Sequence, residues 1–177
     1  IRIANISIDG QKRTYSGWQN HGIMFNQKVT RSTVENVWIN DTSGSAIGLI
    51  GASGSLNTGN YIVGNNIRGS EWAQGIYLKY SDNNVISGNN VQDQVDTPAI
   101  ELSSANRNQV IGNNLKSNGW TGIYIYGTYN IVKGNIVESS GNEGILLTGP
   151  SDTVVVGNTI VSSASFGIYS ENTTRMV

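Results

Sequence analysis

A short motif centred on a Gly-Asn step recurs along the chain at nearly constant spacing, and it restricts the fold more than any other feature. The segments IVGNNI, ISGNNV, VIGNNL, VKGNIV and VVGNTI align in one column, whose asparagines are Asn65, Asn89, Asn113, Asn135 and Asn158. Successive asparagines lie 24, 24, 22 and 23 residues apart. Upstream, VENVWI and IANISI place Asn36 and Asn5 in this column, after longer steps of 29 and 31 residues. Self-similarity at such a period indicates a repeat architecture.

A second column keeps the same register and consists of Gly or Ala, then Ile, then any residue, then mostly an apolar one. Its members begin at Gly22, Ala46, Gly75, Ala99, Gly122, Gly144 and Gly167. Within a unit the pattern has period two, and no unit has the ten or so residues of helical pattern that a βαβ crossover requires. The chain is therefore predicted to be all-β, a right-handed parallel β-helix of about seven coils of 22–31 residues with three short strands each.

The composition fits this architecture. The chain has 23 Asn and 22 Gly, and both residue types tolerate the left-handed backbone of a sharp corner. We expect inward Ile, Leu and Val to form the core. We expect the Asn column to form a ladder of amides bonded to the coils above and below. A leucine-rich repeat has a similar period but needs far more than the seven Leu present.

Charge and cysteine content exclude several classes of function. The net charge is −1 and only 13% of residues are charged, which argues against a nucleic-acid partner or a polybasic membrane patch. No apolar run approaches the roughly 20 residues of a membrane span, so membrane insertion is not expected. The absence of Cys excludes disulfides and thiol chemistry. No metal site or cofactor is evident, and a Ca²⁺ site is an option that no residue pattern supports.

The repeats resemble a known group. From NISIDG at Asn5–Gly10, through NHGIMF at Asn20–Phe25, to GIYS at Gly167–Ser170, the chain is similar to parallel β-helix proteins of the pectate-lyase-like superfamily. That group includes polysaccharide lyases, glycoside hydrolases, mannuronan C5-epimerases, phage tail spikes and NosD-like proteins. The resemblance implies a carbohydrate-active protein that binds and cleaves or modifies an extracellular polysaccharide. The alternative is a non-catalytic structural or adhesive shaft. No catalytic signature of a family is matched.

Only outward side chains and loops of a β-helix can meet a ligand. The period-two pattern places Tyr77, Lys79, Glu101, Tyr124 and Tyr126 outward on one face across three successive coils. Tyr rings suit the faces of sugars. The expected catalytic residues are Lys79, Glu101, Tyr124 and Asp96, and the expected substrate-binding residues are Tyr77, Tyr126, Trp72, Trp120 and Asp93. Plain stabilisation of the sheet by stacked Tyr, or a subunit interface, remains an alternative for this face.

Two chemistries could use these groups. Hydrolysis needs two carboxylates, for which Asp93, Asp96 and Glu101 are the nearest set. Elimination or epimerisation of a uronate needs a cation, a base and often a Tyr acid, which Lys79 with Tyr124 or Tyr126 could supply. For each set the alternative is a solvated charge or salt bridge. His21, the single histidine, is expected to be a surface turn residue.

Loops and chain ends complete the expectations. The insertions Gln11–Asn20 and Gly51–Gly59 break the repeat length, and the first is the better candidate for a binding rim. Residues 1–177 are expected to form a single β-helix domain, as a segment of a larger protein. Neither end carries a capping helix, so flanking domains or a homotrimer are expected to cover the ends. The expected location is secreted or cell-surface, whether extracellular, periplasmic or on a virion.

Overall fold

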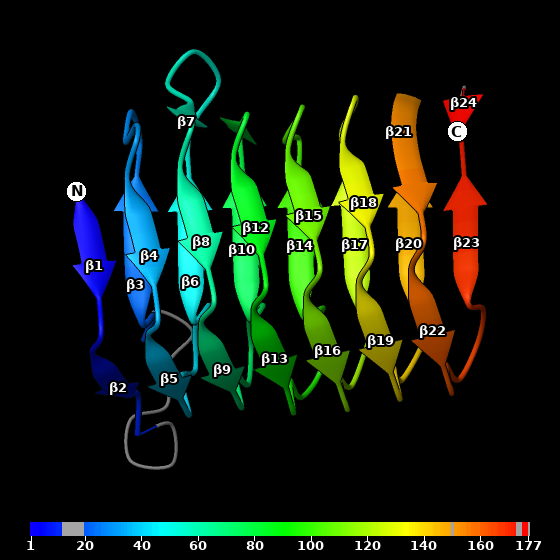
Figure 1. Cartoon of the computed structure of the whole chain (residues 1–177), viewed down its shortest axis with the longest axis horizontal. Coiled ribbons are helices and arrows are strands. Elements are labelled where there is room, and N and C mark those ends of the chain that lie inside the picture. The colour runs from blue at the N-terminus through cyan, green and yellow to red at the C-terminus, as the bar shows by residue number, and fades with distance from the viewer. Residues whose placement is uncertain (12–19, 150, 173–174, 177) are drawn as a thin grey trace.

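The computed structural model describes residues 1–11, 20–149, 151–172 and 175–176, which form short strands wound into a rod (Figure 1). Among these residues there is no helix, and hence no helix that is long and apolar enough to cross a membrane. The strands pair in parallel in three long sheets. The parallel β-helix predicted from the repeat is therefore confirmed.

Each coil contributes one strand to each sheet. Sheet 1 consists of β1 (Arg2–Ala4), β4 (Thr33–Glu35), β8 (Tyr61–Val63), β12 (Val85–Ser87), β15 (Gln109–Ile111), β18 (Ile131–Lys133), β21 (Ser151–Val156) and β24 (Arg175–Met176). Sheet 2 consists of β2 (Ser7–Asp9), β5 (Trp38–Asn40), β9 (Asn66–Arg68), β13 (Asn90–Gln92), β16 (Asn114–Lys116), β19 (Ile136–Glu138) and β22 (Thr159–Val161).

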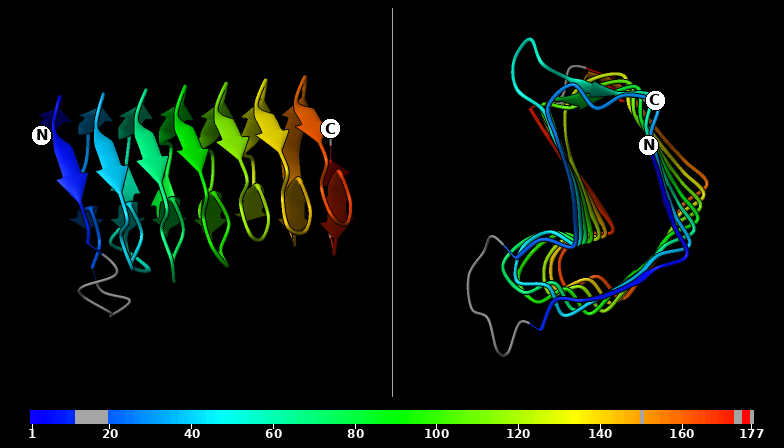
Figure 2. Two further views of the ribbon diagram at one scale, coloured as in Figure 1. Left: turned by 90° about the horizontal axis from the view of Figure 1, so that it is seen from below. Right: turned by 90° about the vertical axis from the view of Figure 1, so that its left-hand side faces the viewer.

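Sheet 3 consists of β3 (Ile23–Asn26), β6 (Ile47–Ile50), β10 (Ile76–Lys79), β14 (Ile100–Ser103), β17 (Ile123–Tyr126), β20 (Ile145–Thr148) and β23 (Ile168–Glu171). A short parallel pair consists of β7 (Asn57–Thr58) and β11 (Ser81–Asp82), which follow the sheet 3 strands β6 and β10 in the chain. Viewed end on, sheets 1 and 3 form opposite walls of the coil, and sheet 2 closes it (Figure 2). The first strand, β1, and the last, β24, lie at opposite ends of the rod (Figure 1).

The core consists of like residues stacked on like. Inward positions of sheet 1 are Ile62, Ile86, Val110 and Val132, all fully buried. Sheet 3 supplies Leu49, Leu78, Leu102, Ile125 and Leu147 in the same way. Because parallel register places each side chain over its equivalent, branched aliphatic residues interdigitate along the whole rod.

The predicted Asn ladder is present at the corner between sheets 1 and 2. Asn65 Nδ2 donates to Asn89 Oδ1 on the next coil at 2.9 Å and to the Val34 carbonyl on the preceding coil at 3.0 Å. Asn89, Asn113 and Asn135 repeat this arrangement towards Asn158. These amides are buried, so each bond satisfies a polar group that water cannot reach.

The two upstream members of the column were assigned wrongly. The register aligns Asn36 with Gly64, not with Asn65, and both have positive φ, 51° and 64°. Asn5 likewise has a φ of 57°. Asn and Gly both adopt this left-handed conformation. The residue types alone therefore did not distinguish the left-handed corner position, occupied by Gly64, from the ladder position that follows it, occupied by Asn65. Val37 fills the ladder position, and its backbone N–H donates to Asn65 Oδ1 at 3.0 Å.

A second ladder, which the sequence analysis did not predict, lies at the corner before sheet 1. Its members are Asn60, Asn84, Asn108 and Asn130. The Nδ2–Oδ1 distances between successive members are 3.0, 3.1 and 3.4 Å. Backbone N–H groups of the preceding coil also donate to these amides, as Ser32 does to Asn60. Sheet 1 is therefore bordered by a buried amide ladder on each side.

Candidate functional site

The outer face of sheet 3 brings together most of the side chains that the sequence analysis selected. Tyr77 pairs in register with Glu101, and Glu101 with Tyr124. Lys79 pairs with Ser103, which pairs with Tyr126. Tyr77, Glu101 and Tyr124 are half-buried, as is Lys79, whereas Tyr126 is 47% exposed. Since parallel strands lie about 4.8 Å apart, Glu101 sits between two phenol rings.

Glu101 is held by an amide from the neighbouring coil. Gln74 Nε2 donates a 2.6 Å hydrogen bond to Glu101 Oε2. Burial raises the pKa of this carboxyl, while the Gln74 bond and the charge of Lys79 partly oppose that effect. Among the described residues no ion pair involves Glu101. The carboxyl is thus shielded from water without being neutralised by a bonded cation.

The neighbouring aromatic side chains are positioned by contacts of their own. Burial and the nearby Glu101 charge both raise the pKa of the Tyr77 phenol. The Trp120 and Tyr124 rings meet edge to face, with centroids 5.8 Å apart. Lys79 Nζ lies 5.9 Å from the centroid of the Tyr80 ring. Trp120 therefore holds the Tyr124 ring in place on this face. Lys79 contributes a partly buried positive charge to the same face.

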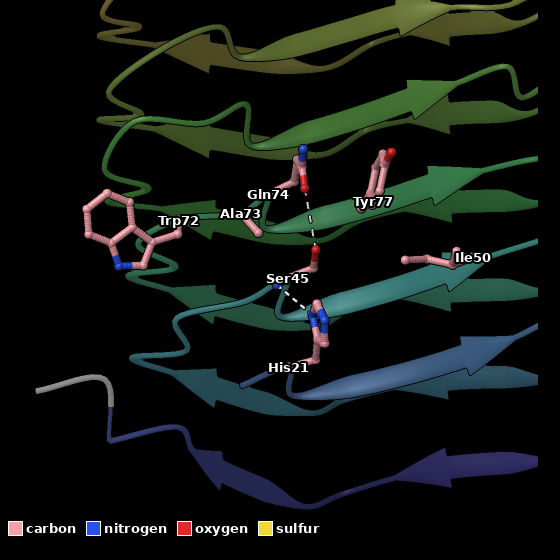
Figure 3. Close-up of a pocket in the computed structure, with 7 residues that line it drawn as sticks. All are labelled: His21, Ser45, Ile50, Trp72, Ala73, Gln74 and Tyr77. Atoms are coloured by element: carbon pink, nitrogen blue, oxygen red, sulfur yellow. Dashed lines mark hydrogen bonds between the residues drawn. The ribbon is translucent and has the colours of Figure 1, made fainter. Parts of the chain in front are cut away.

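A pocket of about 510 Å³ opens at the start of the sheet 3 strands, next to this face (Figure 3). Its lining residues are His21, Ser45, Ile50, Trp72, Ala73, Gln74 and Tyr77. His21, Ser45 and Gln74 stack on successive coils, with Trp72 on one side of them and Ile50 and Tyr77 on the other. Trp72 and Tyr77 were selected from the sequence, whereas Lys79, Glu101, Tyr124 and Tyr126 lie outside the pocket wall.

A line of hydrogen bonds joins the pocket to Glu101. The Ser45 N–H donates to His21 Nδ1 at 2.9 Å, and Ser45 Oγ donates to Gln74 Oε1 at 3.4 Å. Gln74 then uses its Nε2 on Glu101. Burial lowers the pKa of His21, and because Nδ1 accepts, the neutral ring carries its proton on Nε2.

His21 was expected to be a surface turn residue; it lies half-buried just before β3 and lines the pocket. Gln74 and Ser45 of this wall were not selected from the sequence. The signal that could have found this site is the column itself, in which polar residues precede Gly or Ala on three successive coils.

The two aspartates that were selected lie in the connection between β13 and β14. Asp93 pairs with Arg68 of sheet 2, with 2.9 Å between Oδ2 and Nε. It lines a separate depression with Asn118 and Gly119. Asp96 is exposed in the loop before β14. Neither is bonded to Glu101 among the described residues, and these residues contain no cluster of three potential metal-ligating side chains.

Of the two insertion loops, the structure describes only Gly51–Gly59 throughout. The predicted rim Gln11–Asn20 lies mainly outside the described residues, at positions 12–19. The Gly51–Gly59 loop follows β6 and projects from the corner between sheets 3 and 1 (Figure 2). The pocket is lined by Ile50, which directly precedes this loop, but by no residue of the loop itself.

Comparison with known proteins identifies the family. A family model described as right handed beta helix region matches residues 1–160. The chain belongs to the right-handed β-helix family. The expected superfamily and handedness are thereby confirmed. No curated protein matches the chain in sequence.

Solved structures with this fold include enzymes and a tailspike. DFA-IIIase from Arthrobacter chlorophenolicus A6 in complex with GF2 has 14% identity and a TM-score of 0.63, over 88% of this chain and 50% of that one. A double mutant of the periplasmic alginate epimerase AlgG has 12% identity and a TM-score of 0.58, over 99% and 52%. The Dettilon tailspike protein has 17% identity and a TM-score of 0.54, over 86% and 42%. The chain thus spans about half the length of these proteins, and the likeness is one of fold.

Proposed function

We propose that this β-helix binds a polysaccharide along the outer face of sheet 3 and modifies it by elimination or epimerisation at a uronate, with Glu101 as the acid–base group. The observation that carries the proposal is the pocket walled by Trp72 and Tyr77, which Gln74 connects to a shielded carboxyl. On this proposal the protein acts outside the cytoplasm, where such polysaccharides occur.

The binding part of the proposal follows from the aromatic groups. Trp72 is 60% exposed, and Trp72 and Tyr77 line the pocket from opposite sides of the column formed by His21, Ser45 and Gln74 (Figure 3). Rings of this kind offer flat apolar platforms for sugars, and the nearby Ser45 and Gln74 provide hydrogen-bonding groups for hydroxyls. Tyr77, Tyr124 and Tyr126 extend the platform along the rod axis.

The chemical part follows from the groups around Glu101. Lys79 on the adjacent strand would neutralise a uronate carboxylate, which acidifies the neighbouring ring C–H. Glu101 would accept that proton, and its raised pKa brings it closer to neutral pH, where a base is most effective. Tyr124, in register with Glu101, would donate a proton to the departing glycosidic oxygen or to the opposite ring face. Elimination then leaves a carbon–carbon double bond in the sugar.

Hydrolysis is less well supported by the same groups. It requires a second carboxylate near Glu101, and Asp93 is instead engaged by Arg68. The alternative of a structural or adhesive shaft differs from both the uronate-modifying enzyme and the hydrolase in one measurable respect. A shaft would bind a glycan or pack against a partner without turning over a substrate.

The experiment is a panel of polyuronates and neutral glycans, with binding followed by calorimetry and products by ultraviolet absorbance and NMR. We expect binding to a polyuronate, together with an unsaturated product or an inverted C5 centre. In Glu101→Gln we expect turnover to fall at least about a hundredfold with binding retained. Turnover that survives this substitution would contradict the assignment of Glu101, and binding to no glycan would contradict the function as a whole.

A further inference from the structure

Sheet 1 has an unusually apolar outer face. In register along the rod, its outward positions from β8 to β21 are Tyr61, Val85, Gln109, Ile131 and Val154 in one row and Val63, Ser87, Ile111, Lys133 and Val156 in the other. Most are aliphatic or aromatic, and Tyr61 and Val156 are 49% and 47% exposed. The outer face of sheet 2 instead carries Asn66, Asn90 and two ion pairs, Arg68–Asp93 and Lys116–Glu138. A contiguous apolar face of this kind marks an interaction surface.

The order of residues along one row is symmetric about Ser87. Val63 and Ile111 lie one coil from Ser87 on either side, and Glu35 and Lys133 lie two coils away with opposite charges. A twofold rotation about an axis parallel to the strands at Ser87 reverses the rod axis and maps this row onto itself. It brings Val63 opposite Ile111 and Glu35 opposite Lys133. An isologous interface requires this kind of self-complementarity.

We propose that two copies of the chain pack sheet 1 against sheet 1 with their rod axes antiparallel. In this dimer Glu35 faces the partner's Lys133 at one end of the interface, and Lys133 faces the partner's Glu35 at the other. The second row follows the same rotation, with Val85 over its equivalent and Tyr61 opposite Gln109, where a phenol and an amide can share a hydrogen bond.

The charges favour this arrangement over the alternatives. Lys133 is exposed, and within the described part of the chain it has no ion-pair partner. Glu35 contacts Arg2 through one oxygen, which leaves its other oxygen available to a second cation. Packing with the rods parallel would instead bring both copies of Glu35 to the same layer, and both copies of Lys133 likewise, which electrostatics disfavours.

The face is also rigid and separate from the proposed glycan site. The two Asn ladders border sheet 1 along most of its length, so docking orders little additional backbone. Sheet 3 lies on the opposite wall of the coil, so a dimer through sheet 1 leaves both pockets open (Figure 2). Such a dimer would be bivalent for a polysaccharide, which raises avidity without new contacts. The dimer itself does not depend on the proposed function.

The test is sedimentation velocity over a range of concentrations, with folding of each variant checked by circular dichroism. We expect wild type to show a monomer–dimer equilibrium. Glu35→Lys and Lys133→Glu each place like charges at both ends of the homodimer, so each should weaken dimerisation about tenfold or more. An equimolar mixture of the two variants should dimerise again, because every facing pair is then complementary.

Lys116→Glu is the matched control, since it reverses an exposed charge on sheet 2 and should leave dimerisation unchanged. A wild type that stays monomeric, or that forms trimers, would overturn the proposal. So would a mixture that fails to re-form the dimer, or dimers that are insensitive to both charge reversals, because in the parallel register like charges already face each other in wild type and remain so in each variant.

Discussion

Gln74 Nε2 donates a 2.6 Å hydrogen bond to Glu101 Oε2, so an amide in the pocket wall fixes the carboxyl of the next coil. The other end of the same amide, Oε1, accepts from Ser45 Oγ at 3.4 Å. Both ends of the side chain are thereby engaged and its orientation is defined. Under the proposed function, Gln74 would be a positioning residue, which holds Glu101 without contacting the sugar atoms that react.

Replacing Gln74 with Leu should raise the pKa of Glu101 further. The Gln74 bond favours the charged carboxylate, so its loss leaves burial less opposed. If the proposed chemistry holds, the acid limb of the kcat/KM profile moves to higher pH, and an NMR titration of Glu101 moves with it. Gln92→Leu on sheet 2 is the control and should shift neither. An unchanged titration in Gln74→Leu would show that the bond does not tune Glu101.

Glu101→Gln should stabilise the fold at neutral pH. Because the folded-state pKa of Glu101 is raised, the unfolded chain loses its proton first as pH rises, and the folded state is penalised above the unfolded pKa. Below that pKa both states are protonated, and the variant and wild type should differ little. Urea unfolding across a pH series therefore predicts a difference in the free energy of unfolding that grows as pH rises through the folded pKa. A difference that shrinks with rising pH would contradict the sign.

Asn113→Ala should cost about 3 kcal/mol of stability. The Asn113 amide accepts from the backbone and the side chain of Asn89 and donates to the Ile86 carbonyl, all in the buried corner. The substitution leaves these groups without partners. Asn114→Ala changes the neighbouring exposed residue and should lie within about 0.5 kcal/mol of wild type. Equal effects of the two substitutions on chemical unfolding would show that the ladder does not stabilise the coil.

Much of the fold was predictable because the repeat fixes the register. Once Ile76 and Ile100 occupy one column, the alternation along each strand determines that Tyr77 meets Glu101. The ladder was predictable only where Gly precedes Asn. Whether Asn36 occupies the ladder position or the left-handed position before it depends on its φ, which the residue type does not determine.

The second ladder and the pocket were less accessible to sequence reasoning. Asn84 and Asn108 lie in segments that look like ordinary polar turns, and their bonding to one another becomes visible only when the coils are stacked. The wall formed by His21, Ser45 and Gln74 combines three different residue types, so no repeated letter marks it. The hydrogen bonds that build this wall join residues on neighbouring coils that are 24 and 29 positions apart in the sequence.

Polysaccharide binding to Trp72→Ala and Trp38→Ala, measured by calorimetry with the glycan that wild type binds, tests the central claim most directly. The two tryptophans are 60% and 59% exposed, but Trp72 lines the pocket and Trp38 lies on sheet 2. Loss of a stacking platform should weaken binding about tenfold or more in Trp72→Ala and leave Trp38→Ala unchanged. Equal affinities of Trp72→Ala and wild type, or a loss confined to Trp38→Ala, would contradict the placement of the site on sheet 3.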